Sequence, residues 1–422
     1  MRRVSHRRAH RREIAAVALA TQPERNGFLG ITVRAALAAG LVTLLFQTGS
    51  MSGLQESWAD AISRVFRAVP SGQVLLVGIT DADYNRTDLF AGLSPLDPAV
   101  LLRLFQRLAQ HRPAVVAVDI GLQPPPYELP ERRESRRQLY RGLSRLAESG
   151  ATHWVLVETP PTDLQDGDSA TLELWRSLHE LTTRTPSGLT FASPQIRAES
   201  GVIRHVRRCW SETAPAQPAV SLFGAVIGAL DSGDRCTAGE PGADLHIRYT
   251  GGFASRKPGA TGAGRVLTTG DLLQPAAGPR GDTVLTGKAV IVGGLYSGGM
   301  DTYWTPLGTL FGAEIWAEAV DTWRRGDALH EPSWPVIFIL QAAIGMLSGW
   351  LSVRLGRVRG HVAAMLLFAT LTVVFTWLSS GVGFVVVSAL PAFLAAQLNV
   401  HVTDLPNLIA DRAQGMVERR RK

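Results

Sequence analysis

Four aspartates follow predicted strands, at positions where carboxylates could build a binding site. Asp81 and Asp83 come after a first apolar run, Asp119 lies near the end of a second, and Asp301 follows a third. The carboxyl ends of parallel strands meet at one edge of a sheet and form its usual ligand crevice. These residues are therefore candidate ligands for a small molecule or a cation. The alternative is that they cap helices, organise turns or remain as solvated surface charge.

A glycine-rich loop, Gly293–Gly308, connects the third apolar run to a predicted helix. Glycine allows positive φ and lets a ligand approach the backbone closely. Asp301 lies within this loop, Thr305 lies near its end and Glu314 follows it, so the three residues are grouped as candidates. Glu314 falls in the first turn of the helix, where a carboxylate complements the positive end of the helix dipole. Capping is therefore its alternative role.

The sequence contains no motif that indicates an enzyme. It has no H-E-x-x-H and no C-x-x-C. The stretch from Gly281 to Lys288 is not a phosphate-binding loop, because its spacing is one residue too long and no Ser or Thr follows the lysine. Ser297 does not lie in a G-x-S-x-G elbow. We therefore expect a non-enzymatic protein with no cofactor and no catalytic or structural metal.

Short apolar runs alternate with amphipathic segments across residues 50–333. The apolar runs predict buried strands at Val74–Ile79, Ala114–Ile120, His153–Glu158 and Ala289–Gly293. Helical spacing predicts helices at Met51–Val69, Pro98–Gln110, Leu139–Glu148, Leu172–Leu181, Val220–Leu230 and Gly312–Trp323, and alternation predicts half-exposed strands at Val202–Arg208 and Leu245–Tyr249. Valine-rich strands that alternate with helices are typical of a parallel sheet covered on both faces. We predict an α/β domain with a mainly parallel sheet.

Four apolar runs are long enough for membrane helices, which need roughly 17–25 residues. They are residues 28–47, 335–352, 362–378 and 382–398, one before the α/β domain and three after it. A cleaved signal peptide is the alternative for the first run. In the second run, Gly345 and Gly349 share one helix face and allow close helix packing, either within the chain or in a homodimer.

The basic residues are concentrated beside these apolar runs. The tail 1–27 carries seven arginines against two glutamates, the loop 353–360 carries three arginines, and the tail 399–422 carries five basic against three acidic residues. Because the whole chain sums to only +7, the middle is net acidic. Basic flanks stay in the cytoplasm, so we predict cytoplasmic termini and residues 50–333 outside the cell inner membrane. Basic charge confined to membrane flanks also argues against nucleic-acid binding.

The two cysteines, Cys209 and Cys236, both lie in the segment predicted to be exported. An oxidising compartment favours disulfides, so we expect a bond between them. Two unpaired, buried cysteines are the alternative.

The middle segment resembles the type-2 CHASE domain, the cyclase- and histidine-kinase-associated sensory extracellular domain. The resemblance rests on five stretches: Val74–Asp81, Pro98–Ile120, Ser200–Arg207, Tyr249–Gly252, and Gly287–Gly294 continuing through Asp301, Thr305-Pro306 and Gly312–Ala317. Two departures bear on a ligand site, because Leu93–Asp97 replaces a tryptophan-proline element and Trp316 replaces a histidine of the family.

The resemblance implies a membrane sensor. The chain ends where members of the family usually continue into an output domain, so we expect a stand-alone form that signals to a separate cytoplasmic or membrane effector. Its partners would be membrane lipids, that effector and an unidentified small-molecule or envelope ligand. The alternatives are an exported hydrolase and a ligand-binding accessory subunit of a membrane transport complex.

Overall fold

The computed structural model divides the chain into two units, residues 63–329 and a second unit formed by residues 1–62 and 330–422. It describes residues 67–125, 128–158, 169–183, 188–198, 200–210, 219–231, 244–254, 266–274, 285–299, 301–328 and 334–355, with individual helical residues between 36 and 64 and between 359 and 370. The prediction of an α/β domain concerns the first unit.

A six-stranded sheet with the order β4-β3-β2-β10-β1-β9 forms the centre of the first unit. Its strands are β1 (Val74–Thr80), β2 (Val115–Asp119), β3 (His153–Val157), β4 (Leu189–Ala192), β9 (Val266–Thr268) and β10 (Ala289–Leu295). Every neighbouring pair is parallel. The predicted parallel sheet is therefore confirmed, and the last strand along the chain lies between the first two.

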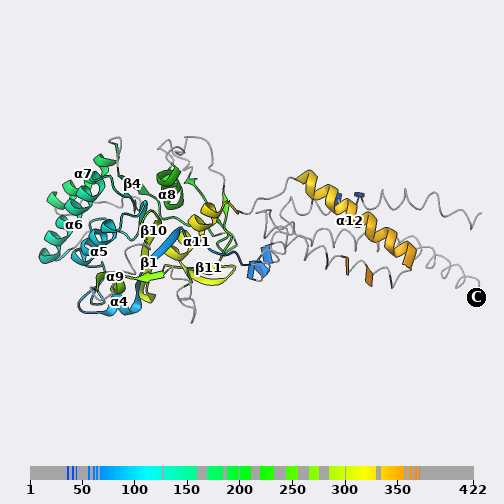
Figure 1. The fold of residues 1–422 in the computed structure, drawn as a ribbon, viewed down its shortest axis with the longest axis horizontal. Coiled ribbons are helices and arrows are strands. Elements are labelled where there is room, and N and C mark those ends of the chain that lie inside the picture. Colours follow the sequence, from blue (N-terminus) through cyan, green and yellow to red (C-terminus); the bar gives the residue numbers. More distant parts are fainter. Residues whose placement is uncertain are drawn as a thin grey trace, which may run out of the picture. The chain divides into compact units, whose positions relative to one another are not determined.

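Helices cover both faces of this sheet. α5 (Pro98–Gln110), α6 (Pro130–Glu148), α7 (Ser169–Thr183) and α9 (Thr269–Leu273) pack on one face, and α8 (Leu222–Asp231) and α11 (Gly312–Arg325) pack on the other. Figure 1 shows α5, α6 and α7 grouped together, apart from α8 and α11. Successive residues of a strand point to opposite faces, so Leu75 and Val77 enter one core while Val74 and Leu76 enter the other. This explains the near-continuous apolar runs.

The predicted half-exposed strands are much shorter in the structure. β5 (His205–Val206) pairs with β8 (Leu245–His246) over two residues. One further bond joins the same two segments, from the amide of Ile247 to the carbonyl of Arg204, but the amide of Ile203 donates to the carbonyl of Trp304. The prediction of full strands at these positions was wrong because the backbone before Arg204 pairs instead with Trp304, in an isolated bridge to Val202.

Several short elements were not predicted. They are the two edge strands β4 and β9, the helix α9, and α4 (Asp81–Asn85), β6 (Cys209–Trp210), β7 (Ala219–Val220), the 3₁₀ turn η3 (Ser297–Gly299), β11 (Thr302–Thr305) and β12 (Gly308–Phe311). β11 lies inside the predicted glycine-rich loop and β12 begins at its last residue, and the two strands form an antiparallel hairpin. Gly308 closes its turn with a φ of 105°, a conformation that suits glycine. The loop is thus a structured hairpin.

In the second unit, α12 (Trp334–Leu355) covers the second apolar run. The described residues of the first and third runs are helical; they are Ala36, Leu37, Gly40, Leu41, Leu44, Val362, Ala363, Leu366, Leu367 and Thr370. The fourth run lies outside the described residues. Within the part of the chain that the structure covers, no helix has the length and apolar composition that a membrane crossing requires.

The helix predicted for Met51–Val69 stops earlier. The described residues between 56 and 64 are helical, whereas residues 67–70 are irregular and Val69 is 82% exposed. Pro70 disfavours the helical conformation of the residue before it, which accounts for an irregular Val69.

Candidate ligand-binding site

A cavity of about 450 Å³ opens at the carboxyl edge of the parallel sheet. It is lined by residues at or beyond the ends of β2, β3, β4 and β10. The chain leaves β2 toward α6 on one face of the sheet, but leaves β10 toward α11 on the other. Neighbouring strands with connections on opposite faces leave a crevice between them, where ligands of open α/β sheets usually bind. The position of the cavity therefore follows from the sheet topology, because β2 and β10 are neighbours whose following helices cover opposite faces.

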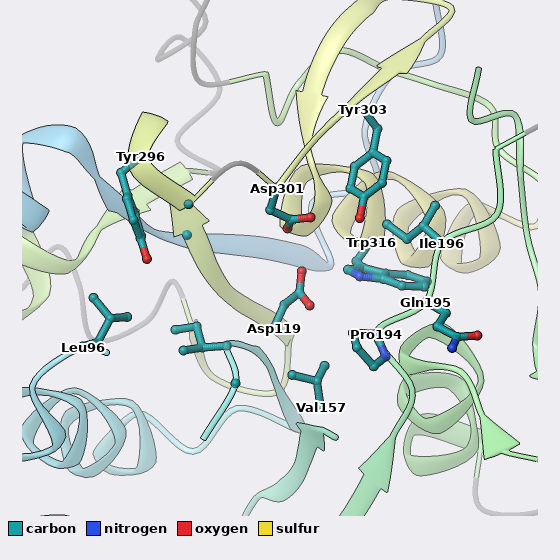
Figure 2. A pocket seen from close by; sticks show the side chains of 14 residues that line it. Leu96, Asp119, Val157, Pro194, Gln195, Ile196, Tyr296, Asp301, Tyr303 and Trp316 are labelled. Atoms are coloured by element: carbon teal, nitrogen blue, oxygen red, sulfur yellow. The ribbon is translucent and has the colours of Figure 1, made fainter. Parts of the chain in front are cut away.

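The cavity combines an apolar wall with a few polar groups (Figure 2). Its aliphatic lining consists of Leu96, Ile120, Val157, Pro194 and Ile196. Its polar side chains are Asp119, Gln195, Tyr296, Asp301, Tyr303 and the indole of Trp316. Mostly apolar walls with a small number of placed polar groups are the usual composition of a small-molecule site.

Asp119 is the last residue of β2 and lies opposite Gly293 of β10 in the register. Its pKa is raised well above the ordinary value for an aspartate, first by burial and then by the negative charge of Asp301. Two carboxyl groups near one another in a region of low dielectric do not both ionise readily. Burial and the charge of Asp301 therefore both favour the neutral, protonated form of Asp119.

Asp301 enters the same cavity from the connection between η3 and β11. Burial raises the pKa of its carboxyl, while hydrogen bonds from the Tyr303 hydroxyl and the Gly312 amide lower it. Gly312 is the first residue of α11, and a Cβ atom there would collide with a carboxyl oxygen of Asp301. Glycine at this position is what lets the carboxyl group approach the helix.

Two tyrosines contribute hydroxyls and ring faces. Burial is the main cause that raises the pKa of Tyr303, and the negative charge of Asp301 raises it further. Tyr296 stacks on Tyr84 of α4, with ring centroids 4.3 Å apart and an interplanar angle of 5°. Burial also raises the pKa of Tyr296. Both phenols are therefore neutral and able to donate hydrogen bonds at physiological pH.

Trp316 lines the cavity from α11, and only 1% of its surface is exposed. Figure 2 shows its indole among Asp119, Asp301 and Tyr303. Its Nε1–H has no hydrogen-bond partner among the residues that the structure describes. Trp154 and Trp175 share that property, but neither of them lines the cavity. The Trp316 indole therefore offers an unused donor at the site.

No group of three His, Cys, Asp or Glu side chains in the described ranges is arranged to hold a metal ion. The cavity contains two carboxyl groups, and the rest of its lining suits the binding of an organic molecule. It can present negative charge, phenol and indole donors, and aromatic faces to one small molecule.

Comparison with known proteins decides the family. The family model described as the CHASE2 domain matches residues 37–356, which is most of the chain. The chain belongs to the CHASE2 domain family. CHASE2 is a family of sensory domains. No curated protein and no solved structure matches the chain.

In this CHASE2 domain, Asp81 and Asp83 accept hydrogen bonds from nearby backbone amides and do not line the cavity. Asp81 accepts hydrogen bonds from the amide and hydroxyl of Ser297, at 2.8 and 3.1 Å. Asp83 is buried and forms a capping box with Thr80, and its other carboxyl oxygen accepts a bond of 3.0 Å from the Gly270 amide. Both aspartates therefore have the turn and capping roles that were the alternative prediction.

Thr305 and Glu314 also serve the local structure of the CHASE2 domain. The Thr305 hydroxyl donates to the Gly308 carbonyl at 2.6 Å and accepts from the Leu307 amide, which stabilises the hairpin turn. Glu314 is 1% exposed and accepts a bond of 2.8 Å from the Phe311 amide at the start of α11. Of the six predicted ligand residues, the structure brings Asp119 and Asp301 together at the cavity.

Cys209 on β6 forms a disulfide. The sequence contains one other cysteine, Cys236, which lies outside the described residues. Gly345 and Gly349 lie one turn apart in α12, and Gly345 is buried. Their role in helix packing stays a prediction.

The sequence did not identify the aromatic residues of the site. Tyr296 and Tyr303 flank the glycine pair Gly298-Gly299, and Trp316 follows Glu314 by two residues. The sequence did mark Trp316 in one way, because it replaces a histidine that is usual in CHASE2 domains. In the structure this residue lines the cavity.

Proposed function

We propose that this CHASE2 protein is a membrane-bound extracytoplasmic sensor that binds a small ligand in the cavity at Asp119 and Asp301. It passes the signal to a separate cytoplasmic effector and catalyses no reaction itself. The cavity carries the proposal, because it lies at the switch point of the sheet and contains two desolvated carboxyl groups beside an unpartnered indole N–H.

The cavity has polar groups that can hold a ligand, and its described lining lacks the side chains that most often act as nucleophiles. Among its described lining residues, there is no Ser, Cys, Thr, Lys or His that could act as a nucleophile or as a nitrogen base. The carboxyl groups and phenols that remain can hold a ligand by charge and hydrogen bonds. An exported hydrolase, the main rival, would have to use Asp119 and Asp301 as its acid and base.

Placement in the membrane is supported by the flanking segments. The apolar runs at 28–47, 335–352, 362–378 and 382–398 are bordered by arginine-rich stretches. Large apolar side chains on the described helices of these runs are exposed, including Leu37, Leu44, Ile339 and Leu366. Exposed apolar side chains in such number suit contact with lipid. The basic borders then put both termini in the cytoplasm and the sheet domain outside.

The test compares two acidic residues that lie close together in the sequence. Asp301→Asn changes the cavity, whereas Glu314→Gln changes the cap of α11. Each full-length variant would replace the wild-type chain in its native host, and transcript profiles would be compared with those of wild-type and deletion strains. Protein abundance in the membrane fraction would normalise the response.

We expect Asp301→Asn to give the deletion profile at normal abundance. We expect Glu314→Gln to lower abundance and thermal stability, by about 0.5–2 kcal/mol for a lost cap, while the response per molecule stays unchanged. A wild-type profile from Asp301→Asn at normal abundance would refute the proposal that this cavity drives signalling.

A further inference from the structure

The cavity has a one-sided electrostatic character. Its titratable side chains are Asp119, Asp301, Tyr296 and Tyr303, all of which are neutral or negative. Among the residues described as lining it, there is no Lys, Arg or His that could neutralise the two carboxyl groups. Both carboxyl groups are partly withdrawn from water, which disfavours their charged forms unless an opposite charge is nearby. A bound cation would supply that opposite charge.

The rest of the lining indicates what kind of cation would fit. A hard metal ion takes six or more oxygen ligands, whereas much of this wall is aliphatic or aromatic. An ammonium group needs only a few acceptors, and its carbon skeleton would cover Leu96, Ile120 and Ile196. Rings such as that of Tyr303 also attract a cation through their faces.

The indole of Trp316 adds a second requirement. Its Nε1–H has no partner in the described structure and is enclosed, so a ligand acceptor would satisfy it once the indole turns slightly toward the cavity. A carboxylate acceptor would be repelled by Asp119 and Asp301. A hydroxyl or carbonyl oxygen would bind Trp316 without that repulsion.

We propose that the cavity binds a small organic ammonium compound whose N–H groups bond Asp119 and Asp301 and whose neutral oxygen accepts from Trp316. This inference rests on the proposed function and names the ligand class of the same site. The incoming positive charge takes the place of the proton that burial favours on Asp119, and that proton leaves to solvent. Binding is therefore coupled to proton release.

The test uses three compounds of equal length and different charge: 4-aminobutan-1-ol, butane-1,4-diol and 4-hydroxybutanoate. Each would be titrated calorimetrically into the purified full-length protein in detergent. A wider panel of primary amino alcohols with two to six carbons would cover the size of the cavity. Calcium and magnesium would be titrated separately.

We expect an amino alcohol of the panel to bind at least tenfold more tightly than its diol, and the hydroxy acid not to bind. Its affinity should rise with pH by up to tenfold per unit, until the proton that it displaces is already lost. The heat of binding should depend on the ionisation enthalpy of the buffer. The diols should show neither effect.

Three variants connect binding to the residues. Asp119→Asn should weaken amine binding at least tenfold and remove proton release. Trp316→Phe should weaken it several-fold and leave proton release intact. Asp271→Asn, an exposed carboxylate of α9 that does not line the cavity, should bind like the wild type. Thermal unfolding would show that each variant is folded.

Equal affinity for amine and diol, binding of the hydroxy acid, an unchanged Asp119→Asn variant, or binding of divalent metal alone would each overturn the ligand assignment. So would the absence of binding by every amino alcohol of the panel. If Asp301→Asn still abolishes the response in cells, only the ligand class is wrong. If Asp301→Asn responds normally although amines bind, the role of the cavity in signalling is wrong.

Discussion

Ser71 and Asp321 are joined by three hydrogen bonds across 250 positions of the sequence. The Ser71 amide and hydroxyl donate to the same carboxyl oxygen of Asp321, at 3.0 and 2.5 Å. Asp321 is fully buried and also pairs with Arg325 one turn further along α11. Ser71 lies directly before β1, so these bonds connect the entry of the sheet domain to the helix that ends it. The same helix carries Trp316 to the cavity.

Replacement of Ser71 by alanine should weaken this connection without disrupting the core. The loss of one hydroxyl bond to a charged group should cost about 1.5–3 kcal/mol of unfolding free energy. If α11 transmits the signal, the response in cells should change by more than the loss of folded protein explains. Ser177→Ala on α7 is the control, because its hydroxyl bonds only within its own helix. An unchanged response per folded molecule would exclude this route.

Glu318 should make stability depend on pH. It is fully buried and accepts bonds from the amides of Thr250 and Gly251, yet burial raises its pKa to about 7. The folded state holds this proton more tightly than the unfolded state, whose pKa is 4.5. Unfolding free energy should therefore fall by roughly 3 kcal/mol as pH rises from 4.5 to 7, at about 1.4 kcal/mol per unit.

The variant Glu318→Gln should remove this part of the pH dependence. Denaturant unfolding of the full-length protein, followed by tryptophan fluorescence at pH 4.5 to 8, would measure it. The amide group of glutamine meets backbone donors, so the variant should also lose about 1–3 kcal/mol. Glu134→Gln on the exposed side of α6 is the control. A slope unchanged in Glu318→Gln would disprove the assignment.

Asp119→Asn should stabilise the ligand-free protein at high pH. The folded pKa of Asp119 is raised, so the wild type loses stability as pH rises above the ordinary aspartate value of 3.8. Asparagine cannot ionise and avoids this cost, which is about 1.4 kcal/mol for each unit by which the pKa is raised. The melting temperature of the variant should exceed that of the wild type at pH 8, and the difference should shrink toward pH 4. A difference that is constant with pH would contradict this explanation.

The disulfide of Cys209 should stabilise the domain. If its partner is Cys236, the bond closes a loop with 26 intervening residues, which is worth roughly 3 kcal/mol in the chain-entropy model. Cys209→Ser and treatment with a reductant should lower the melting temperature equally, and the reductant should not affect the variant further. Thiol labelling of the denatured, non-reduced wild type should find no free cysteine. Two labelled thiols would rule out the pairing.

Reporter fusions test the proposed topology. Fusions after Gly360 and Lys422 should be active as cytoplasmic reporters, and a fusion at Gly239 should be active only as an exported reporter. The reason is that the arginine-rich segments beside the apolar runs resist export. An exported reporter at Lys422 would show that the number of membrane crossings is wrong.

The long elements could be predicted because their signals are local. The spacing of Val100, Leu104 and Leu108 gives α5 an apolar face, and the predicted bounds Pro98–Gln110 agree with the structure. The order of the strands in the sheet could not be predicted from local residue spacing. β10 lies between β1 and β2 because of long-range packing, for example that of Ala313 of α11 against Gly293.

For the site, two of the six predicted ligand residues, Asp119 and Asp301, line the cavity, and its aromatic residues were not predicted. Strand-end aspartates were candidates as a group, but residues three apart can satisfy one another locally, as Asp83 does with Thr80. Asp301 does bond the nearby Tyr303, yet it lies in the same cavity as Asp119 only because of the fold. Tyr303 and Trp316 could not be found from the sequence, because a tyrosine on a hairpin or a tryptophan in an amphipathic helix is ordinary until the tertiary structure places it.

The position of β10 has a consequence for how the domain is made. β1 and β2 are never neighbours, so each exposes an unpaired edge until residues 289–295 are available between them. About two hundred residues are synthesised between Thr80 and Ala289, and none of them can complete the sheet. Such edges are prone to pair with other chains until residues 289–295 have been synthesised. The time between the emergence of the first strand and the arrival of the last is therefore when this protein should depend most on chaperones.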